Sequence, residues 1–301
     1  MLDVVIIGAG TAGMSAGIYA ARSGKTALIL EKKAYGGQII NTPNVENYPG
    51  IKSISGFAFA TGLYEQVTAL GVKVAFEEAV SIEDCGDYKV VNTNENSYET
   101  KAVIIATGAK NRQLGIDREE QFTGAGISYC ATCDGAFFRG RDVAVIGGGN
   151  TAVEDALFLS NYCNKVYVIL RRDVFRADPK DVEILKDKEN VEFIYNSNIA
   201  KIHGENTVDG IELRDKEGKE TFLKVQGIFV AIGQVPDNQS FQSLISIDDA
   251  GYVIASEDCK TNVEGIYTAG DCRTKSVRQL TTAASDGAVA ALAACERINK
   301  N

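Results

Sequence analysis

Short, almost wholly apolar runs alternate with stretches of helical periodicity in the first part of the chain. The runs at 2–7, 27–30 and 101–108 have the length of strands, and continuous apolar character is typical of strands buried on both faces of a parallel sheet. A helical pattern over 11–21 lies between the first two runs, and an amphipathic pattern predicts another helix over 57–70. Strands that alternate with helices predict an α/β fold with a parallel sheet.

The same order of elements restarts near residue 141. A strand at 141–146 precedes a helical pattern that continues to Tyr162, and a second strand follows at 166–170. The apolar run 228–233 ends in glycine, as the earlier run 103–108 does. We interpret this as duplication of one nucleotide-binding unit, with the second copy inserted into the first. The predicted architecture is two Rossmann-like, three-layer ββα domains, with boundaries at 1–112 plus 240–301 and at 113–239.

Shorter segments with strand character lie between these runs. They predict a small meander in each half, and the turn-rich crossings between the two domains suggest a paired hinge. The expected meander strands are 72–76, 80–82, 88–91 and 97–100 in the first half, and 191–195, 210–214 and 221–225 in the second. The crossings are 108–113 and 233–238, further helices are expected at 180–188 and 283–298, and a strand over 265–271 is expected to lead into a turn.

The first predicted strand ends in a glycine-rich turn with the spacing of a dinucleotide-binding fingerprint. Gly8 makes the tight turn, Gly10 allows the backbone to approach a pyrophosphate, and Gly13 allows the helix to pack closely on the strand. The pyrophosphate rests on the helix N-terminus. Glu31 ends the following strand, where an acidic residue can bind a ribose hydroxyl.

A second fingerprint follows the strand at 141–146, and its surroundings carry a different charge. No acidic residue ends the next strand; a cluster of arginines is found there instead. Guanidinium groups pair with phosphate and a carboxylate would repel it, so this cluster predicts NADP(H) rather than NAD(H). The alternative is a solvated basic turn. The predicted contacts are Gly147, Gly149, Asn150, Thr151, Ala152, Arg171, Arg172 and Arg176.

Between the two fingerprints, Cys130 and Cys133 are separated by two residues, and Asp134 follows directly. This spacing suits a small disulfide ring that opens and closes through thiolate chemistry. The alternatives are half of a zinc site or two buried structural thiols, but tetrahedral zinc needs four ligands and no second Cys-x-x-Cys is present. The single histidine, His203, is about 70 residues away, so Asp134 is the candidate general acid.

Composition narrows the class of function and the compartment. The 301 residues carry a net charge of −9 and the pI is near 4.9, which argues against nucleic acid as a partner. The other cysteines are scattered, unlike a secreted disulfide framework. No apolar run approaches the ~18 residues of a membrane span, and the chain opens without a signal-peptide pattern. We therefore expect no membrane association, no metal site and a cytoplasmic location.

Taken together, these motifs resemble those of the low-molecular-weight bacterial thioredoxin reductases over essentially the whole chain. The shared motifs are Gly36-Gly37-Gln38, Val45 to Gly50, Ala106-Thr107-Gly108, Cys130 to Asp134, Gly147 to Ala152, Arg171-Arg172 with Arg176, Gly270-Asp271 and Arg278-Gln279-Leu280. The resemblance implies FAD at the first fingerprint, NADPH at the second, and a homodimer. It also implies FAD contacts from Gly37, Gln38, Asn47, Asp271, Arg278, Gln279 and Leu280.

The activity that the resemblance implies is the reduction of thioredoxin by NADPH. NADPH reduces FAD, which reduces the Cys130–Cys133 disulfide, and the dithiol then reduces oxidised thioredoxin. Cys133 is expected to face the flavin, Cys130 to attack the disulfide of thioredoxin, and Asp134 to handle the proton. The family exchanges these partners by rotating one domain on the other, and the turn-rich crossings fit such a motion.

The chain departs from the usual family pattern at Leu170, where a histidine commonly precedes the arginine pair, and at Thr11, which replaces a common proline. The arginines remain, and the NADPH prediction with them. Competing functions are a flavin-dependent dithiol oxidase that uses oxygen, a reductase of a related thioredoxin-like partner with a different electron donor, and a non-catalytic redox sensor. The arginine cluster argues against the oxidase, and Asp134 beside the cysteine pair argues against the sensor.

Overall fold

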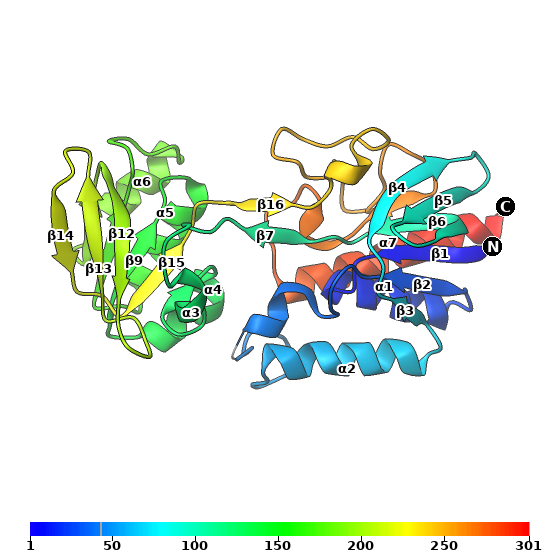
Figure 1. The fold of residues 1–301 in the computed structure, drawn as a ribbon, viewed down its shortest axis with the longest axis horizontal. Coiled ribbons are helices and arrows are strands. Elements are labelled where there is room, and N and C mark those ends of the chain that lie inside the picture. Colours follow the sequence, from blue (N-terminus) through cyan, green and yellow to red (C-terminus); the bar gives the residue numbers. More distant parts are fainter. Residues whose placement is uncertain (43, 301) are drawn as a thin grey trace. The chain divides into compact units, whose positions relative to one another are not determined.

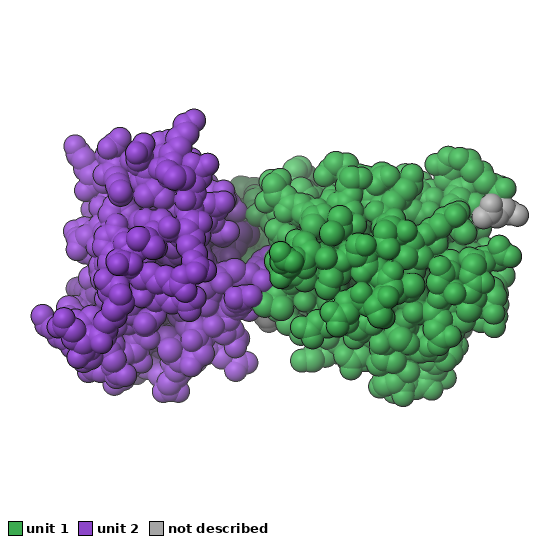
Figure 2. All heavy atoms as spheres, turned by 90° about the horizontal axis from the view of Figure 1, so that it is seen from above, with its two compact units in different colours: residues 1–110, 235–301 green, residues 111–234 purple. Residues whose placement is uncertain are grey.

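The computed structural model describes residues 1–42 and 44–300 and divides into two compact units (Figure 2). Unit 1 contains residues 1–110 and 235–301, and unit 2 contains residues 111–234. Each unit has a sheet with a parallel core of strands, to which unit 1 adds antiparallel strands at one edge, and this confirms the predicted α/β class with two Rossmann-like domains (Figure 1). Strands β7 (Ala109–Asn111) and β16 (Gln234–Pro236) pair with each other where the chain passes between the units.

Unit 1 is a three-layer arrangement around a seven-stranded sheet. Its strands are β1 (Leu2–Ile7), β2 (Ala27–Leu30), β3 (Lys73–Ala75), β4 (Ala79–Asp84), β5 (Lys89–Thr93), β6 (Ser97–Ile105) and β17 (Ile266–Thr268). Its helices are α1 (Thr11–Arg22), η1 (Gly37–Asn41), α2 (Gly56–Ala69), η3 (Gln239–Phe241), η4 (Gly270–Cys272) and α7 (Leu280–Lys300). The strand order is β3-β2-β1-β6-β5-β4, and β17 also pairs with β6. The first part of β6 pairs antiparallel with β5, and its second part pairs parallel with β1.

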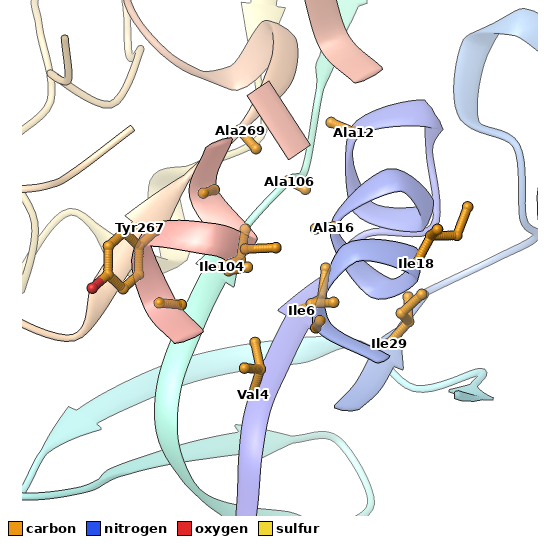
Figure 3. Packing of buried hydrophobic residues seen from close by; sticks show 14 of the residues in the cluster. Val4, Ile6, Ala12, Ala16, Ile18, Ile29, Ile104, Ala106, Tyr267 and Ala269 are labelled. Carbon is orange, nitrogen blue, oxygen red and sulfur yellow. The ribbon is translucent and has the colours of Figure 1, made fainter. Parts of the chain in front are cut away.

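Alternation along β1 sends its side chains into two separate cores. Val4 and Ile6 belong to the cluster that packs under helices α1 and α7, whereas Val5 and Ile7 belong to the cluster under the meander. Figure 3 shows the first cluster, in which Ile6 lies beside Ala16 of α1. A strand buried on both faces needs an unbroken apolar run, which is the pattern seen in the sequence.

Unit 2 repeats this plan. Its elements are α3 (Glu119–Phe122), β8 (Ile127–Ser128), α4 (Ala131–Asp134), η2 (Gly135–Phe138), β9 (Asp142–Ile146), α5 (Asn150–Ser160), β10 (Lys165–Ile169), α6 (Pro179–Lys186), β11 (Val191–Ile194), β12 (Ser197–His203), β13 (Gly210–Asp215), β14 (Glu220–Leu223) and β15 (Gly227–Val230). The parallel sheet has the order β11-β10-β9-β15-β8, and β12, β13 and β14 form a separate antiparallel sheet. Val143 and Val145 of β9 face the α5 side, and Ala144 and Ile146 face the meander side.

The predicted long helices are confirmed within a few residues at each end. Helix α2 begins after Ser55, whose hydroxyl accepts a hydrogen bond from Ala58 N at 3.1 Å, and α6 begins after Asp178, which caps Lys180 N at 2.9 Å. Helix α7 extends the prediction of 283–298 by a few residues at its start. Throughout the described ranges, no helix combines the length and the apolar character needed to cross a bilayer.

Two of the predicted strands are present, but their assignment to the meanders was wrong. The segment 72–76 contains β3, which pairs parallel with β2, and the segment 191–195 contains β11, which pairs parallel with β10. Both are edge strands of the parallel sheets, and a short apolar run does not encode which neighbour it joins. Strand β12 was not predicted, because an irregularity between Ile199 and Lys201 interrupts its period of two.

Candidate functional site

The turn after β1 gives the three fingerprint glycines different roles. Gly8 has φ +109°, and a Cβ there would lie 2.3 Å from the carbonyl oxygen of Ala106. A Cβ on Gly13 would lie 1.8 Å from the carbonyl oxygen of Gly8. Gly10, at the start of α1, has no described atom within 4 Å of the Cβ position. The fold therefore requires glycine at 8 and 13, whereas the space at Gly10 is open to a group that approaches the helix N-terminus.

Glu31 follows β2 and is tied to this turn. Its Oε2 accepts a hydrogen bond from Ala9 N at 2.9 Å, and its Oε1 accepts one from Lys33 N at 3.0 Å. Each carboxylate oxygen has a second lone pair, so the fixed carboxylate can also accept from ribose hydroxyls. The side chain is thus held where the fingerprint pattern expects it.

The turn after β9 has the same geometry in unit 2. Gly147 has φ +150°, and a Cβ there would lie 2.3 Å from the carbonyl oxygen of Ala231, just as Gly8 meets Ala106. Gly149 precedes α5 and, like Gly10, has no described atom within 4 Å of its Cβ position. Ala152 takes the third small position and is fully buried. Both turns therefore leave the same open space at the second glycine, as a dinucleotide needs.

The predicted phosphate site lies beyond the end of β10. Arg171, Arg172 and Arg176 are exposed, and none of their guanidinium groups forms an ion pair with any residue that the structure describes. Arg176 N donates to the carbonyl oxygen of Gly148 at 2.6 Å, which places this segment beside the glycine turn. Leu170 is buried, and its side chain packs where a Cβ on Gly148 would be. The departure at Leu170 therefore fills the core and adds no charge to the site.

Thr151 and Asn150 begin helix α5 next to this segment. Asn150 Oδ1 accepts a hydrogen bond from Asp178 N at 2.9 Å, and Thr151 is exposed. Asn150 thus links the helix start to the segment that follows the arginines.

The residues expected to hold FAD beyond the first fingerprint lie in three segments of unit 1. These are the loop with Gly37 and Gln38, the segment with Asn47, and the segment 271–280. Gly36 N donates to the carbonyl oxygen of Ala9 at 2.7 Å, which brings the loop containing Gly37 and Gln38 against the first fingerprint. Gln38 Nε2 donates to the carbonyl oxygen of Ala109. Asn47 Nδ2 donates to Gln279 Oε1 at 3.2 Å, so the segment with Asn47 contacts the segment 271–280. Leu280 is the first residue of helix α7.

Asp271 and Arg278 lie near the two ends of the segment that connects η4 to α7. Arg278 donates to the carbonyl oxygen of Asp271 at 3.4 Å, and its guanidinium stacks 4.2 Å from the ring centroid of Tyr252. The carboxylate atom Oδ1 of Asp271 is buried and has no hydrogen-bond partner among the described residues. Burial raises the pKa of Asp271, although Lys275 and Arg278 act in the opposite direction. A buried acceptor without a partner suits a hydroxyl donor of a bound cofactor.

The two candidate redox cysteines are joined in unit 2. Cys130 and Cys133 form a disulfide with their Cα atoms 5.3 Å apart, and Cys130 precedes the single turn α4. Cys130 Sγ lies 3.4 Å from Thr132 Oγ1. Tyr129, just before the pair, donates to Glu119 Oε1 at 2.8 Å, and the backbone of Leu114 donates to the same carboxylate at 2.7 Å. The segment that enters the disulfide ring is thus anchored to the start of unit 2.

Asp134 lies inside the same turn and is half-buried. Ser128 Oγ donates to Asp134 Oδ2 at 2.6 Å, while Asp134 Oδ1 is buried without a partner among the described residues. Burial raises the pKa of Asp134, and the hydrogen bond from Ser128 lowers it in part. A carboxyl group with a raised pKa beside a disulfide can hold and release a proton during thiol exchange.

Two residues that carry no sequence signal, Ser128 and Asn196, lie next to predicted site residues. Asn196 N donates to the carbonyl oxygen of Arg172 at 3.3 Å, and Asn196 Oδ1 is buried without a partner within the described chain. Neither residue belongs to a motif, so only the fold could place them beside Asp134 and Arg172. Each predicted group lies within one unit: the FAD residues in unit 1, the dithiol and the NADPH residues in unit 2.

Known proteins share this arrangement over almost the whole chain. The profile of the pyridine nucleotide-disulphide oxidoreductases matches residues 2–287. A thioredoxin reductase of Bacillus subtilis (strain 168) is 40% identical over 291 residues, which cover 96% of this chain and 92% of that protein. A solved thioredoxin reductase from Streptococcus pyogenes MGAS5005 is 41% identical with a TM-score of 0.96, covering 100% of this chain and 99% of that one. A "34.2 kDa protein in rubredoxin operon" of Clostridium pasteurianum is 43% identical over 295 residues, covering 97% of this chain and 96% of that protein.

Two glycine-rich turns of the dinucleotide-binding type and a disulfide between closely spaced cysteines in one chain are the features of the flavin- and pyridine-nucleotide-dependent disulfide oxidoreductases. The protein belongs to the pyridine nucleotide-disulphide oxidoreductase family. Its resemblance to the thioredoxin reductases, inferred above from motifs, is confirmed.

Proposed function

We propose that the protein is an NADPH-dependent thioredoxin-disulfide reductase, with FAD held by unit 1 and NADPH held by unit 2. The observation that carries the proposal is the Cys130–Cys133 disulfide followed directly by Asp134, whose Oδ1 is buried, in the same unit as a glycine-rich nucleotide turn and the unpaired arginines beyond β10. The similarity to thioredoxin reductases over nearly the full length of the chain supports it.

The FAD site would use the open space at Gly10 for the pyrophosphate, Glu31 for a ribose, and Asp271 Oδ1 for a further hydroxyl. The NADPH site would use the matching space at Gly149, and Arg171 with Arg172 for the 2′-phosphate. When bound, the two cofactors together supply the two electrons that open the Cys130–Cys133 disulfide.

The dithiol then reduces the protein substrate by two exchanges. The thiolate of Cys130 attacks the disulfide of thioredoxin, so one new S–S bond forms and the bond within thioredoxin breaks. Cys133 next attacks Cys130 in the mixed disulfide, which restores the internal disulfide and releases thioredoxin with two thiols. The sulfur that leaves in each exchange takes a proton, and we propose that Asp134, at the end of the turn α4, supplies it. The assignment of the two cysteines follows their order in the family motif.

The remaining parts of the proposal concern the setting. We expect a homodimer, because the family resemblance implies one. We expect a cytoplasmic location because the cysteines outside the pair are free, one exposed and four buried. Thioredoxin itself, rather than a related small disulfide protein, is the first substrate to test.

An anaerobic titration of the purified protein tests the whole proposal. We expect a flavin spectrum that NADPH bleaches, that NADH bleaches only at much higher concentration, and that oxidised thioredoxin restores. A ferredoxin-flavin thioredoxin reductase from Clostridium acetobutylicum is 27% identical to this chain, so a flavin that NADPH fails to bleach should next be offered reduced ferredoxin. Failure with NADPH would remove the proposed electron donor, and failure of thioredoxin to restore the spectrum would remove the proposed substrate.

Replacing Asp134 by asparagine should slow the turnover of thioredoxin by about 10²-fold, because the leaving thiolate loses its proton donor. Since burial raises the pKa of Asp134, its protonated form persists above the usual range for aspartate and is lost as pH rises through the raised pKa. The rate of the wild-type protein should therefore fall across that range, whereas the rate of Asp134→Asn should not. The measurement is the pH dependence of kcat with thioredoxin.

The matched control is Ser128→Ala. Ser128 donates to the ionised form of Asp134, so its removal should raise the pKa of Asp134 further and move the fall in rate to higher pH. A profile of Asp134→Asn that keeps the wild-type fall would show that another group supplies the proton.

A further inference from the structure

A buried ion-pair cluster lies next to the turn that carries Asp271. It consists of Arg273, Lys275 and Asp286, whose side chains are 2%, 6% and 8% exposed. Charged groups are seldom buried unless they are paired and fully hydrogen-bonded. None of the three belongs to the motifs that predicted the FAD site, so the cluster calls for a separate explanation.

The carboxylate of Asp286 is the centre of the cluster. Arg273 donates to both of its oxygens, from Nε to Oδ2 at 2.8 Å and from Nη2 to Oδ1 at 2.9 Å. Lys275 Nζ donates to Oδ2 at 2.9 Å. The fourth donor is the backbone N–H of Gly270, also 2.9 Å from Oδ2. Burial opposes ionisation of Asp286, but the hydrogen bonds from Arg273 and Lys275 outweigh it and lower the pKa.

The bond to Gly270 connects the cluster to the first fingerprint. Gly270 has φ +81°, and a Cβ there would lie 2.8 Å from the Cβ of Ala12 on α1. Gly287, the neighbour of Asp286 on α7, would place a Cβ 2.1 Å from the carbonyl oxygen of Ala12. Asp286 therefore fixes the turn η4 at the point where α7 and this turn both close on the fingerprint helix.

Asp271 is the residue that this arrangement presents. It directly follows Gly270, and its Oδ1 is buried without a partner in the described chain. On the other side of Asp271, Arg278 Nη2 donates to the carbonyl oxygen of Arg273 at 3.3 Å. The backbone on both sides of Asp271 is thus held, while one oxygen of its carboxylate is left for a ligand.

We propose that Asp286 is a positioning residue for FAD: through Gly270 N and Arg273 it fixes the turn that presents Asp271 Oδ1 to a hydroxyl of the cofactor. This inference rests on the proposed binding of FAD in unit 1. Asp286 itself does not touch the cofactor; it acts through Asp271. A purely structural ion pair would stabilise unit 1 without any specific link to Asp271.

A double-mutant cycle on FAD affinity tests this link. The variants are Asp286→Asn, Asp271→Asn and the double variant, and the measurement is the dissociation constant of FAD, from the flavin fluorescence released on dilution. Each single change should weaken FAD binding by about tenfold or more, the cost of losing a hydrogen bond to a charged group. Because the two residues act in series, the double variant should bind FAD no more than about threefold more weakly than the weaker single variant.

Two further variants separate positioning from charge balance. Lys275→Met removes one hydrogen bond but leaves the Arg273 fork and the Gly270 contact, so FAD affinity should change by less than about threefold. Asp286→Asn combined with Lys275→Met keeps the net charge of the wild-type cluster. If Asp286→Asn alone fails to fold because the buried cations Arg273 and Lys275 lose the carboxylate between them, this combined variant replaces it in the cycle.

The results distinguish a positioning role of Asp286 from a purely structural ion pair. Losses in FAD affinity that multiply to about a hundredfold in the double variant would show independent action and overturn the positioning role. An Asp286→Asn variant that lowers the unfolding temperature but binds FAD as the wild type does would also overturn it. A wild-type protein that takes up no FAD would remove the proposed function and this inference with it, whereas the two results above leave FAD bound to the wild type and overturn the inference alone.

Discussion

Replacing Cys130 by serine should abolish the reduction of thioredoxin while leaving the reduction of bound flavin by NADPH intact. Cys130 forms the internal disulfide with Cys133, and the chain has no second pair of cysteines that the structure joins within its described residues. A hydroxyl is a far weaker nucleophile than a thiolate at neutral pH. We expect kcat with thioredoxin to fall by at least about 10³-fold, as is typical when a covalent nucleophile is removed.

The partner variant Cys133→Ser distinguishes the roles of the two sulfurs. With Cys133 removed, Cys130 can attack thioredoxin but the mixed disulfide cannot be resolved, so a covalent complex should accumulate and be visible on a gel without reductant. Cys85→Ser is the matched control, because Cys85 is exposed and lies outside the ring; its turnover should equal that of the wild type. A covalent complex that forms with Cys130→Ser instead would reverse the assignment.

The central strands of the parallel sheets could be predicted because a strand buried on both faces needs an apolar residue at every position of one short segment. Strand β1 sends Val4 and Ile6 into one core and Val5 and Ile7 into the other, so every position must be apolar. The pairing of edge strands is not local: β3 and β11 are short, and only the assembled sheet shows that they join its parallel edge. The same limit explains why β12, with its irregular register, was missed.

The two glycine-rich turns could also be predicted, because the constraint acts on single residues at a fixed spacing. Gly8 has a backbone angle and a close contact that other residues do not tolerate, so glycines at this spacing predict the turn. Ser128 and Asp286 act through hydrogen bonds to Asp134 and to Gly270, and neither has a pattern around it. Supporting residues of this kind become visible only when the fold brings distant segments together.

The arginines beyond β10 should decide the choice between the two nicotinamide cofactors. Arg171 and Arg172 are exposed, and within the described part of the chain neither is engaged by a carboxylate, so both guanidinium groups are available to a 2′-phosphate. A hydrogen bond to a charged group contributes about 1.5–3 kcal/mol, so Arg171→Ala with Arg172→Ala should lower kcat/KM for NADPH by about 10²-fold or more. NADH lacks the phosphate, and its kcat/KM should change by less than about threefold.

Two controls make this prediction specific to the phosphate. Arg214→Ala removes an exposed arginine of the same unit that is paired with Glu220 on the meander, and it should leave the preference unchanged. The KM for NADPH should rise with ionic strength in the wild type and much less in the double variant, because salt screens the exposed charges that the variant lacks. If both cofactors lose activity equally, the arginines support the fold of the turn rather than the phosphate, and the determinant of NADPH preference must lie on another segment of unit 2.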